Sequence, residues 1–181
     1  MRISPLPAEE WDDRTRYAVK ALVPRQRQNP QGAGPAISTL ARHPDLVEAY
    51  LGLGVYVMMR STLEPRIREL VVLRVAQRHS CAYIWVSHVR ASTDAGLSAA
   101  EIEGVQHGTL PDPFEQILLD TVDELEENYD LSERTWAALS ERLDERQRMD
   151  LVFTIGHYGM LAMAYNTFGV MPDPQEIPET R

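Results

Sequence analysis

The sequence is poor in three features, and each shortage narrows the class of protein. Its 181 residues include a single cysteine, Cys81, so an internal disulfide is impossible and a cytoplasmic location is favoured. No run of about 18 apolar residues occurs, which argues against a membrane-spanning helix. Because Met1 to Asp13 contains no apolar stretch, we also expect no signal peptide.

Positive charge is also scarce, with 18 basic against 27 acidic residues and a net charge of −9. This balance argues against a nucleic acid or an anionic membrane surface as the main partner. Apolar residues make up 44% of the chain and charged residues 25%, as in globular proteins. We therefore expect one folded domain, which at this length buries roughly 70% of its unfolded surface.

Strand signals are nearly missing, since no long apolar–polar alternation is bounded by Asn-Gly or Asp-Gly turns. Helix start and stop signals are frequent instead. The sequence therefore predicts an all-α helical bundle. The expected helices are Pro7 to Leu22, Ala36 to Ala41, Pro44 to Arg60, Pro65 to Arg78, Cys81 to Ala95, Ser98 to His107, Asp112 to Asn128, Ser132 to Leu143 and Asp144 to Phe168.

Proline and glycine divide the chain into three parts. Residues 1–35 are predicted to form a first helix and an extended arm, since the segment from Pro24 to Pro35 is rich in Pro, Gly and Gln. Residues 36–170 are predicted to form the helical domain, and residues 171–181 an extended tail.

Two of the expected helices, Pro44 to Arg60 and Pro65 to Arg78, are apolar on nearly all sides. Arg74 is the one charge inside the apolar run of the second helix. A helix of this kind lies in the centre of a core or under another subunit. We therefore expect a homo-oligomer.

The candidate site lies in the segment from Glu69 to His88. Ser80 is a good N-cap, which makes Cys81 the first residue of the next helix, where the helix dipole favours a thiolate. Cys81, Ile84 and His88 then share one stripe of that helix. Glu69 comes from the preceding helix. Carboxylate, thiol and imidazole in an apolar bundle suit acid–base chemistry, although a lone Cys or His in a core is more often structural.

The same segment resembles the carboxymuconolactone decarboxylase family, which includes the AhpD-like alkylhydroperoxidases. The resemblance runs from Ile37 to Val105 and returns loosely at Gly156-His157-Tyr158. The AhpD pattern is Glu, eleven residues, Cys, two residues, Cys, three residues, His; this chain supplies Glu69, Cys81 and His88. Ile84 replaces the second cysteine, so the dithiol mechanism is not expected.

The resemblance implies an AhpD-like bundle, assembled as a trimer or hexamer, acting on a small molecule. In the decarboxylase branch it implies a carboxylated lactone substrate and neither a metal nor an organic cofactor. The catalytic residues it implies are His88 as the general acid/base, Glu69, which would orient His88 or set its charge, and Cys81, which would line the pocket or assist. Expected pocket walls are Tyr83 and Trp85, and candidate carboxylate ligands are Arg68, Arg74 and Arg78.

Two alternatives stay open at this point. One is a hydroperoxide reductase that uses Cys81 alone, with an external thiol resolving the sulfenic acid. The other is a non-catalytic binding or assembly protein on the same scaffold. A metal site is not expected, because the histidines lack paired ligand spacing and no second cysteine is present.

Overall fold

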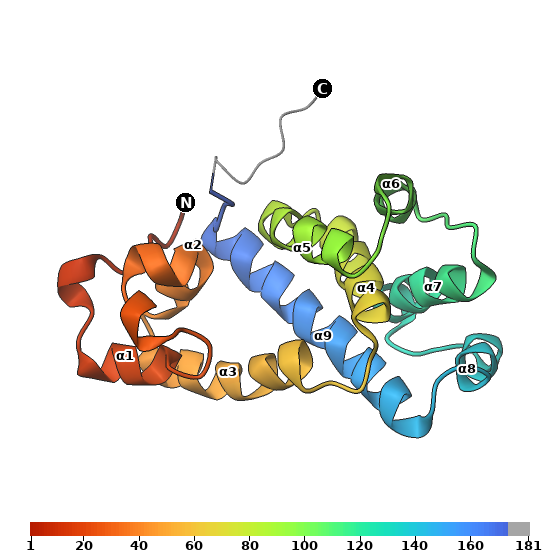
Figure 1. The fold of residues 1–181 in the computed structure, drawn as a ribbon, viewed down its shortest axis with the longest axis horizontal. Helices are drawn as coiled ribbons and strands as arrows, with labels where there is room; N and C mark the ends of the chain where they lie inside the picture. The colour runs from red at the N-terminus through yellow and green to blue at the C-terminus, as the bar shows by residue number, and fades with distance from the viewer. Residues whose placement is uncertain (174–181) are drawn as a thin grey trace. The chain divides into compact units, whose positions relative to one another are not determined.

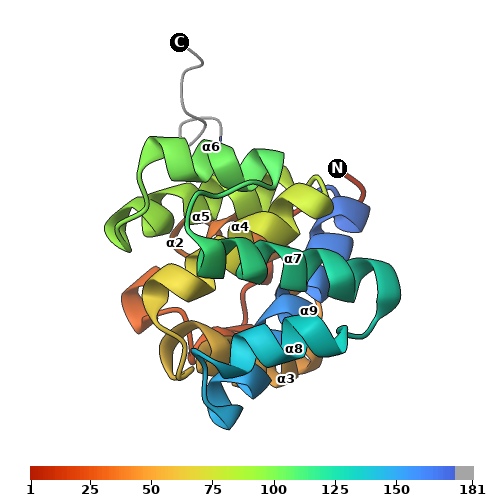
Figure 2. The same cartoon turned by 90° about the vertical axis from the view of Figure 1, so that its right-hand side faces the viewer.

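Helices joined by short turns make up the structure, a computed structural model that describes residues 1–173 (Figures 1 and 2). No strand occurs in that range, so the all-α prediction is confirmed. The chain forms two compact units, one of Met1–Arg60 with the residues from Ala164 onward and one of Ser61–Met163. The predicted divisions after residues 35 and 170 stay predictions. Most of the predicted tail, 171–181, lies outside the described residues.

Among its described residues, the first unit contains two 3₁₀ turns, the helices α1, α2 and α3, and the last residues of α9, with α1 and α2 both packed against α3. The predicted helix from Pro7 to Leu22 is wrong in extent. It is interrupted because Asp12 caps a new helix, accepting a hydrogen bond from the Thr15 N–H at 2.8 Å. The elements are η1 (Ala8–Glu10), α1 (Asp13–Val19), η2 (Arg25–Arg27), α2 (Pro30–Leu40) and α3 (Pro44–Met59).

The predicted extended arm is also wrong in its second half, where α2 begins at Pro30 instead of at Ala36. Asn29 caps this turn by accepting a hydrogen bond from the Gly32 N–H at 2.8 Å. Gly34 then leaves the helical conformation at φ 75°, and the helix resumes with Pro35. Glycine allows this kink within the helix, whereas the Pro- and Gly-rich composition of the segment had indicated a loop.

The second unit is built around α4, which contacts α5, α6 and α7 (Figures 1 and 2). From Leu70 to Ala76 the side chains of α4 are at most 9% exposed. This helix is therefore covered within its own chain, and its apolar character is no argument for a partner subunit. The helices are α4 (Pro65–Arg78), α5 (Ala82–Asp94), α6 (Ala99–His107), α7 (Pro113–Asn128), α8 (Glu133–Ser140) and α9 (Glu145–Phe168) as far as Met163.

Helix boundaries in this unit follow the predicted caps. Ser98 and Glu101 form a capping box at the start of α6, and Asp112 and Ser132 cap α7 and α8. The end of α8 was predicted at Leu143 and lies at Ser140. None of the helices among residues 1–173 is long and apolar enough to cross a bilayer.

Ion pairs fix α4 among its neighbours. The Arg74 guanidinium donates to both carboxylate oxygens of Asp123, at 2.8 and 2.6 Å, and to the Val105 carbonyl at 3.1 Å. Arg66 donates to Glu115 at 2.6 Å and to Glu101 at 2.5 Å. These pairs join α4 to α6 and α7, so the backbone that presents Glu69 is held on two sides.

α9 is fastened to the segment just before α4. Asp150 accepts hydrogen bonds from the Thr62 N–H at 2.6 Å and from the Thr62 hydroxyl at 2.8 Å. The Ser61 hydroxyl donates to the same oxygen at 3.3 Å. This contact fixes the position along α9 at which its later residues meet the site.

Apolar side chains of α3 remain exposed in the first unit. Met59 is 70% exposed and Leu46 is 51% exposed, although both lie on a helix with few charges. The prediction of a partner surface therefore depends on α3 and not on α4.

Candidate active site

Glu69 and His88 are the sequence-predicted residues that the fold brings into direct contact. Glu69 lies on α4 and His88 on the neighbouring α5, and His88 Nδ1 is 2.7 Å from Glu69 Oε2. The Glu69 side chain is 4% exposed and that of His88 is 17% exposed. The carboxylate thus lies inside the unit, and the imidazole lies between it and solvent.

Arg68, one of the three candidate ligands for a substrate carboxylate, lies beside this pair. Arg68 Nε donates to Glu69 Oε1 at 3.1 Å, so each carboxylate oxygen has a different basic partner. Burial raises the pKa of Glu69, but the hydrogen bond and charge of His88, with those of Arg68, outweigh it and leave the pKa below its ordinary value. Glu69 is therefore ionised at neutral pH.

The ionised state of Glu69 determines which nitrogen of the His88 ring carries a proton. An ionised carboxylate only accepts hydrogen bonds, so Nδ1 of His88 must donate to it. Nε2 is then left to exchange a proton with a bound molecule. A carboxylate behind an imidazole is an arrangement suited to general acid–base chemistry.

The ring of Tyr158, on α9, packs against the ring of His88. The two rings meet edge to face, with centroids 5.0 Å apart and planes at 89°. The sequence reading had noted Tyr158 only within a loose resemblance, because no local spacing connects α9 to α5. Its contact restricts the orientation of the imidazole.

Cys81 lies at the start of α5, one position from where the sequence placed it. The helix begins at Ala82, Cys81 is the N-cap, and Ser80 takes a left-handed turn at φ 50°. The predicted N-cap role of Ser80 is therefore wrong. Because α5 rises about 1.5 Å per residue, Cys81 and His88 are separated by roughly 10 Å along the axis.

Burial dominates the chemistry of the Cys81 thiol. Its side chain is buried at 2% exposure, and burial raises the pKa above its ordinary value. The backbone N–H groups of Ile84 and Tyr83 act in the opposite direction but do not reverse the shift. The thiol form is therefore the major one at neutral pH.

The remaining predicted residues divide by their place around α5. Trp85 lies about 60° around the axis from His88 and is half-buried, so it borders the same face. Tyr83 lies about 140° away and does not share that face. Ile84, where the family pattern has its second cysteine, is buried at 2% exposure. The wall roles of Tyr83 and Trp85 stay predictions.

Of the three arginines proposed for a substrate carboxylate, two hold acidic residues of α7. Arg74 is bound to Asp123, and Arg78 Nη2 donates to Glu127 at 3.1 Å. Arg68, with a side chain 19% exposed, lies at the Glu69–His88 pair. The geometry thus favours Arg68 for this role over the other two.

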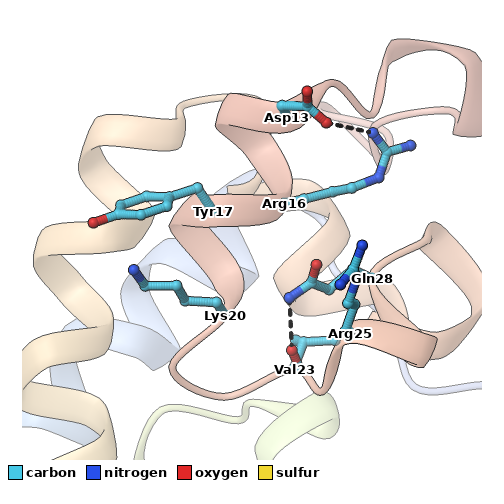
Figure 3. Close-up of a pocket in the computed structure, with 7 residues that line it drawn as sticks. All are labelled: Asp13, Arg16, Tyr17, Lys20, Val23, Arg25 and Gln28. Atoms are coloured by element: carbon cyan, nitrogen blue, oxygen red, sulfur yellow. Dashed lines mark hydrogen bonds and ion pairs between the residues drawn. The ribbon is translucent and has the colours of Figure 1, made fainter.

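A separate hollow in the first unit is basic but fully open (Figure 3). Arg16, Lys20 and Arg25 line it, and all three are exposed, with Arg16 paired to Asp13 at 3.6 Å. Solvated cations on an open surface do not form a catalytic centre. The chemistry therefore points to the second unit.

Sequence reasoning missed a second glutamate–histidine pair in that unit. His79 Nε2, at the end of α4, lies 2.8 Å from Glu126 Oε2 on α7. The two residues are far apart in the sequence, and neither belongs to a recognisable motif. Only the packing of α4 against α7 brings them together.

Solved structures of similar fold support the assignment of the architecture. The chain is 19% identical to a peroxidase-related protein with an alkylhydroperoxidase AhpD core from Ralstonia eutropha JMP134, at a TM-score of 0.78, covering 97% of this chain and 95% of that one. A putative antioxidant defence protein AhpD from Agrobacterium tumefaciens is 20% identical, with a TM-score of 0.64 and coverage of 73% and 93%.

A third similar structure is that of the debrominase Bmp8. It is 12% identical with a TM-score of 0.73, covering 96% of this chain and 93% of that one. A cysteine-to-alanine variant of Bmp8 has been crystallised in complex with 2,3,4-tribromopyrrole. A comparison with the curated proteins finds no match.

The sequence itself matches one family profile. Residues 44–114 match the carboxymuconolactone decarboxylase family, and this segment contains Glu69, Cys81 and His88. The all-helical fold is shared with the AhpD-like structures, and the family match covers the segment that carries the candidate site.

Proposed function

We propose that the protein is a cofactor-independent enzyme that moves a proton on a small carboxylated lactone or a related organic acid. The observation that carries the proposal is the 2.7 Å contact between the ionised, buried Glu69 and the partly exposed His88. The match of residues 44–114 to the carboxymuconolactone decarboxylase family supports it.

Each residue has a defined part in the reaction. Glu69 accepts the Nδ1–H of His88, which orients the ring and stabilises its protonated form. Nε2 then takes up or delivers the proton at the reacting carbon. In a decarboxylation, the bond between that carbon and the carboxylate breaks, CO₂ leaves, and the protonated imidazole supplies the proton that replaces it.

Arg68 supports the choice of an anionic substrate. It lies at the Glu69–His88 pair, where a guanidinium can bind a carboxylate through two hydrogen bonds. Trp85 borders the His88 face of α5 and offers an apolar wall for the ring of the substrate. The role of Cys81 in this reaction is to fill the start of α5.

The test is a set of small carboxylated lactones incubated with the protein in D₂O. We expect CO₂ release, with deuterium incorporated at the carbon that lost it, and loss of both signals in His88→Ala. Turnover by His88→Ala at the wild-type rate would remove His88 from the mechanism. No turnover of any lactone by the wild type, with the oligomer intact, would favour a non-catalytic scaffold.

A second candidate function is reduction of an organic hydroperoxide by Cys81. The observation in its favour is the place of Cys81 at the N-terminus of α5, where the backbone N–H groups of Ile84 and Tyr83 act to lower the pKa of the thiol against the effect of burial. The cysteine variant of the debrominase in complex with a bromopyrrole, and the peroxidase-related neighbours, add support. The thiolate would attack the peroxide, release the alcohol and become a sulfenic acid, which two external thiols reduce.

This candidate is tested by adding an organic hydroperoxide and measuring the intact mass. A gain of one oxygen at Cys81, reversed by a thiol reductant, is the expected signature. An unchanged mass, with the peroxide still present, would exclude the reductase.

We further propose a homotrimer, or a hexamer built from two trimers, in the cytoplasm. The exposed apolar side chains of α3, such as Met59, support a covered surface, and the single cysteine accords with a reducing compartment. Sedimentation of a stable monomer at micromolar concentration would contradict the oligomer.

A further inference from the structure

A groove separate from the Glu69–His88 pair runs between the end of α7 and α9 in the second unit. It has a volume of about 420 Å³, within the range of small-molecule sites. His79 and Glu126 lie in its lining, together with apolar side chains of α9. It therefore combines one polar point with an apolar surface.

The polar part of the groove is His79 and Glu126, which are partly buried and in contact with each other. The side chains of His79 and Glu126 are 19% and 22% exposed, and Glu126 Oε2 is 2.8 Å from His79 Nε2. The second oxygen, Oε1, lies over Gly159 of α9, 3.3 Å from where a Cβ at that position would be. A glycine here leaves this carboxylate oxygen uncovered by α9.

The apolar surface also contains a glycine. A Cβ placed at Gly156 would meet nothing within 4 Å, so the helix surface is open there. Ile155 is buried at 2% exposure, while Met160 and Met163 are 46% and 58% exposed. A flat helix surface bordered by two thioethers favours an aromatic ring, because methionine sulfur makes attractive contacts with aromatic edges.

A tyrosine stands at the rim of the groove. Tyr129 ends α7 in a left-handed conformation, at φ 61°, and is 90% exposed. Tyrosine rarely adopts this conformation, and here it turns the end of α7 so that the ring borders the groove. The ring of Tyr129 thus offers an aromatic surface to a bound ring, in addition to the thioethers of α9.

We propose that this groove binds a small aromatic molecule that carries one N–H or O–H donor, of the indole or phenol class. The donor would bond to Glu126 Oε1, and the ring would lie on the surface of α9 at Gly156 and Gly159, beside Met160. The inference is independent of the reaction at His88, because it concerns binding at other residues.

Indole and benzofuran are suitable probes, since they share a shape and only indole has an N–H. Binding to the full-length protein is measured by calorimetry and by saturation-transfer NMR. We expect indole to bind saturably and more tightly than benzofuran. Glu126→Gln should weaken indole about five- to tenfold and leave benzofuran unchanged, because only indole loses a hydrogen bond to a charged acceptor.

Gly156→Leu should weaken both probes by at least about tenfold, equivalent to 1.4 kcal/mol, because the side chain fills the groove. Gly52→Leu is the matched control, since Gly52 is also a helical glycine with nothing within 4 Å of its Cβ position. Both changes favour the helix, so both variants should melt at or above the wild-type temperature. Only Gly156→Leu should lose the probes.

Three results would overturn the proposal. The first is binding of indole to the wild type that does not saturate, and the second is binding of indole to Gly156→Leu as tight as to the wild type. The third is a wild type that binds neither probe and an oligomer that becomes smaller in Gly156→Leu, which would make the groove an interface between copies of this chain.

Discussion

The two glutamate–histidine pairs of the second unit have nearly the same contact distance but differ in how deeply the glutamate is buried relative to its histidine. In one, Glu69 is 4% exposed and stands behind His88, at 17%. In the other, Glu126 and His79 are 22% and 19% exposed, so the carboxylate is as accessible as the imidazole. The contacts measure 2.7 and 2.8 Å, and distance alone does not distinguish them.

The order of the two groups determines what each pair can do. A buried carboxylate acts through its histidine, which then presents a reactive nitrogen to a substrate. An accessible carboxylate accepts a hydrogen bond from a ligand by itself. The first pair is therefore suited to proton transfer and the second to binding.

The largest expected effect breaks the first pair alone. His88→Ala should lower kcat about 10²- to 10⁴-fold on a confirmed lactone substrate, because proton transfer by a positioned group typically contributes that much. His107→Ala is the control, since His107 is 71% exposed on α6. Equal losses in the two variants, measured by steady-state kinetics at unchanged oligomer size, would contradict the assignment.

A third histidine sharpens the comparison, because at His157 burial lowers the pKa to about 4. The folded state keeps this imidazole neutral while the unfolded chain takes up a proton near pH 6.5. Stability should therefore fall as the pH drops from about 6.5 to about 4, by up to about 3 kcal/mol.

Urea unfolding at several pH values tests this expectation. His157→Gln should flatten the loss across that interval, whatever it costs at neutral pH. His107→Gln, which changes an exposed imidazole, should retain the wild-type slope. An unchanged slope in His157→Gln would refute the prediction.

Glu69→Gln converts the first pair from charged to neutral without removing the hydrogen-bonding side chain. We expect kcat/KM to fall about 10- to 100-fold, because the neutral amide no longer stabilises the positive charge that the imidazole acquires during proton transfer. A purely structural role would lower the folded fraction in proportion to the loss of activity. Glu103→Gln, an exposed change on α6, serves as the control.

The smallest expected effect concerns Cys81. Cys81→Ser should change lactone turnover less than about threefold, because a hydroxyl fills the space and proton transfer needs no thiolate. The same change would abolish hydroperoxide reduction, since serine cannot replace a thiolate nucleophile. Measuring both activities on one preparation separates the two candidate functions.

Much of the fold was predictable because helix caps are local. Ser98, Asp112 and Ser132 each satisfy backbone N–H groups within three residues, so their roles can be read from sequence. Asp12 and Asn29 are capping residues of the same kind, but Asp12 was included in one helix beginning at Pro7, and Asn29 in an arm rich in Pro, Gly and Gln. At both positions the capping residue indicates the observed start of a helix.

The site was less predictable because its contacts cross between helices. Glu69 and His88 were found through the family pattern, which already contains the geometry of α4 and α5. Spacing could not choose among Arg68, Arg74 and Arg78, since it does not reveal that Arg68 lies against Glu69 while the other two pair with acidic residues of α7. His79 and Glu126 meet only through the packing of α4 on α7, for which the sequence has no local signal.

Selection for stability and selection for ligand binding would act in opposite directions on Tyr129, which has a left-handed backbone conformation. An L-residue held in that conformation costs roughly 1 kcal/mol, which glycine would recover. Laboratory evolution for heat resistance alone should therefore replace this tyrosine early, because the gain comes without any change at His88. Evolution that also rewards retention of an aromatic ligand should keep it, so the fate of one surface residue would report which demand has shaped the protein.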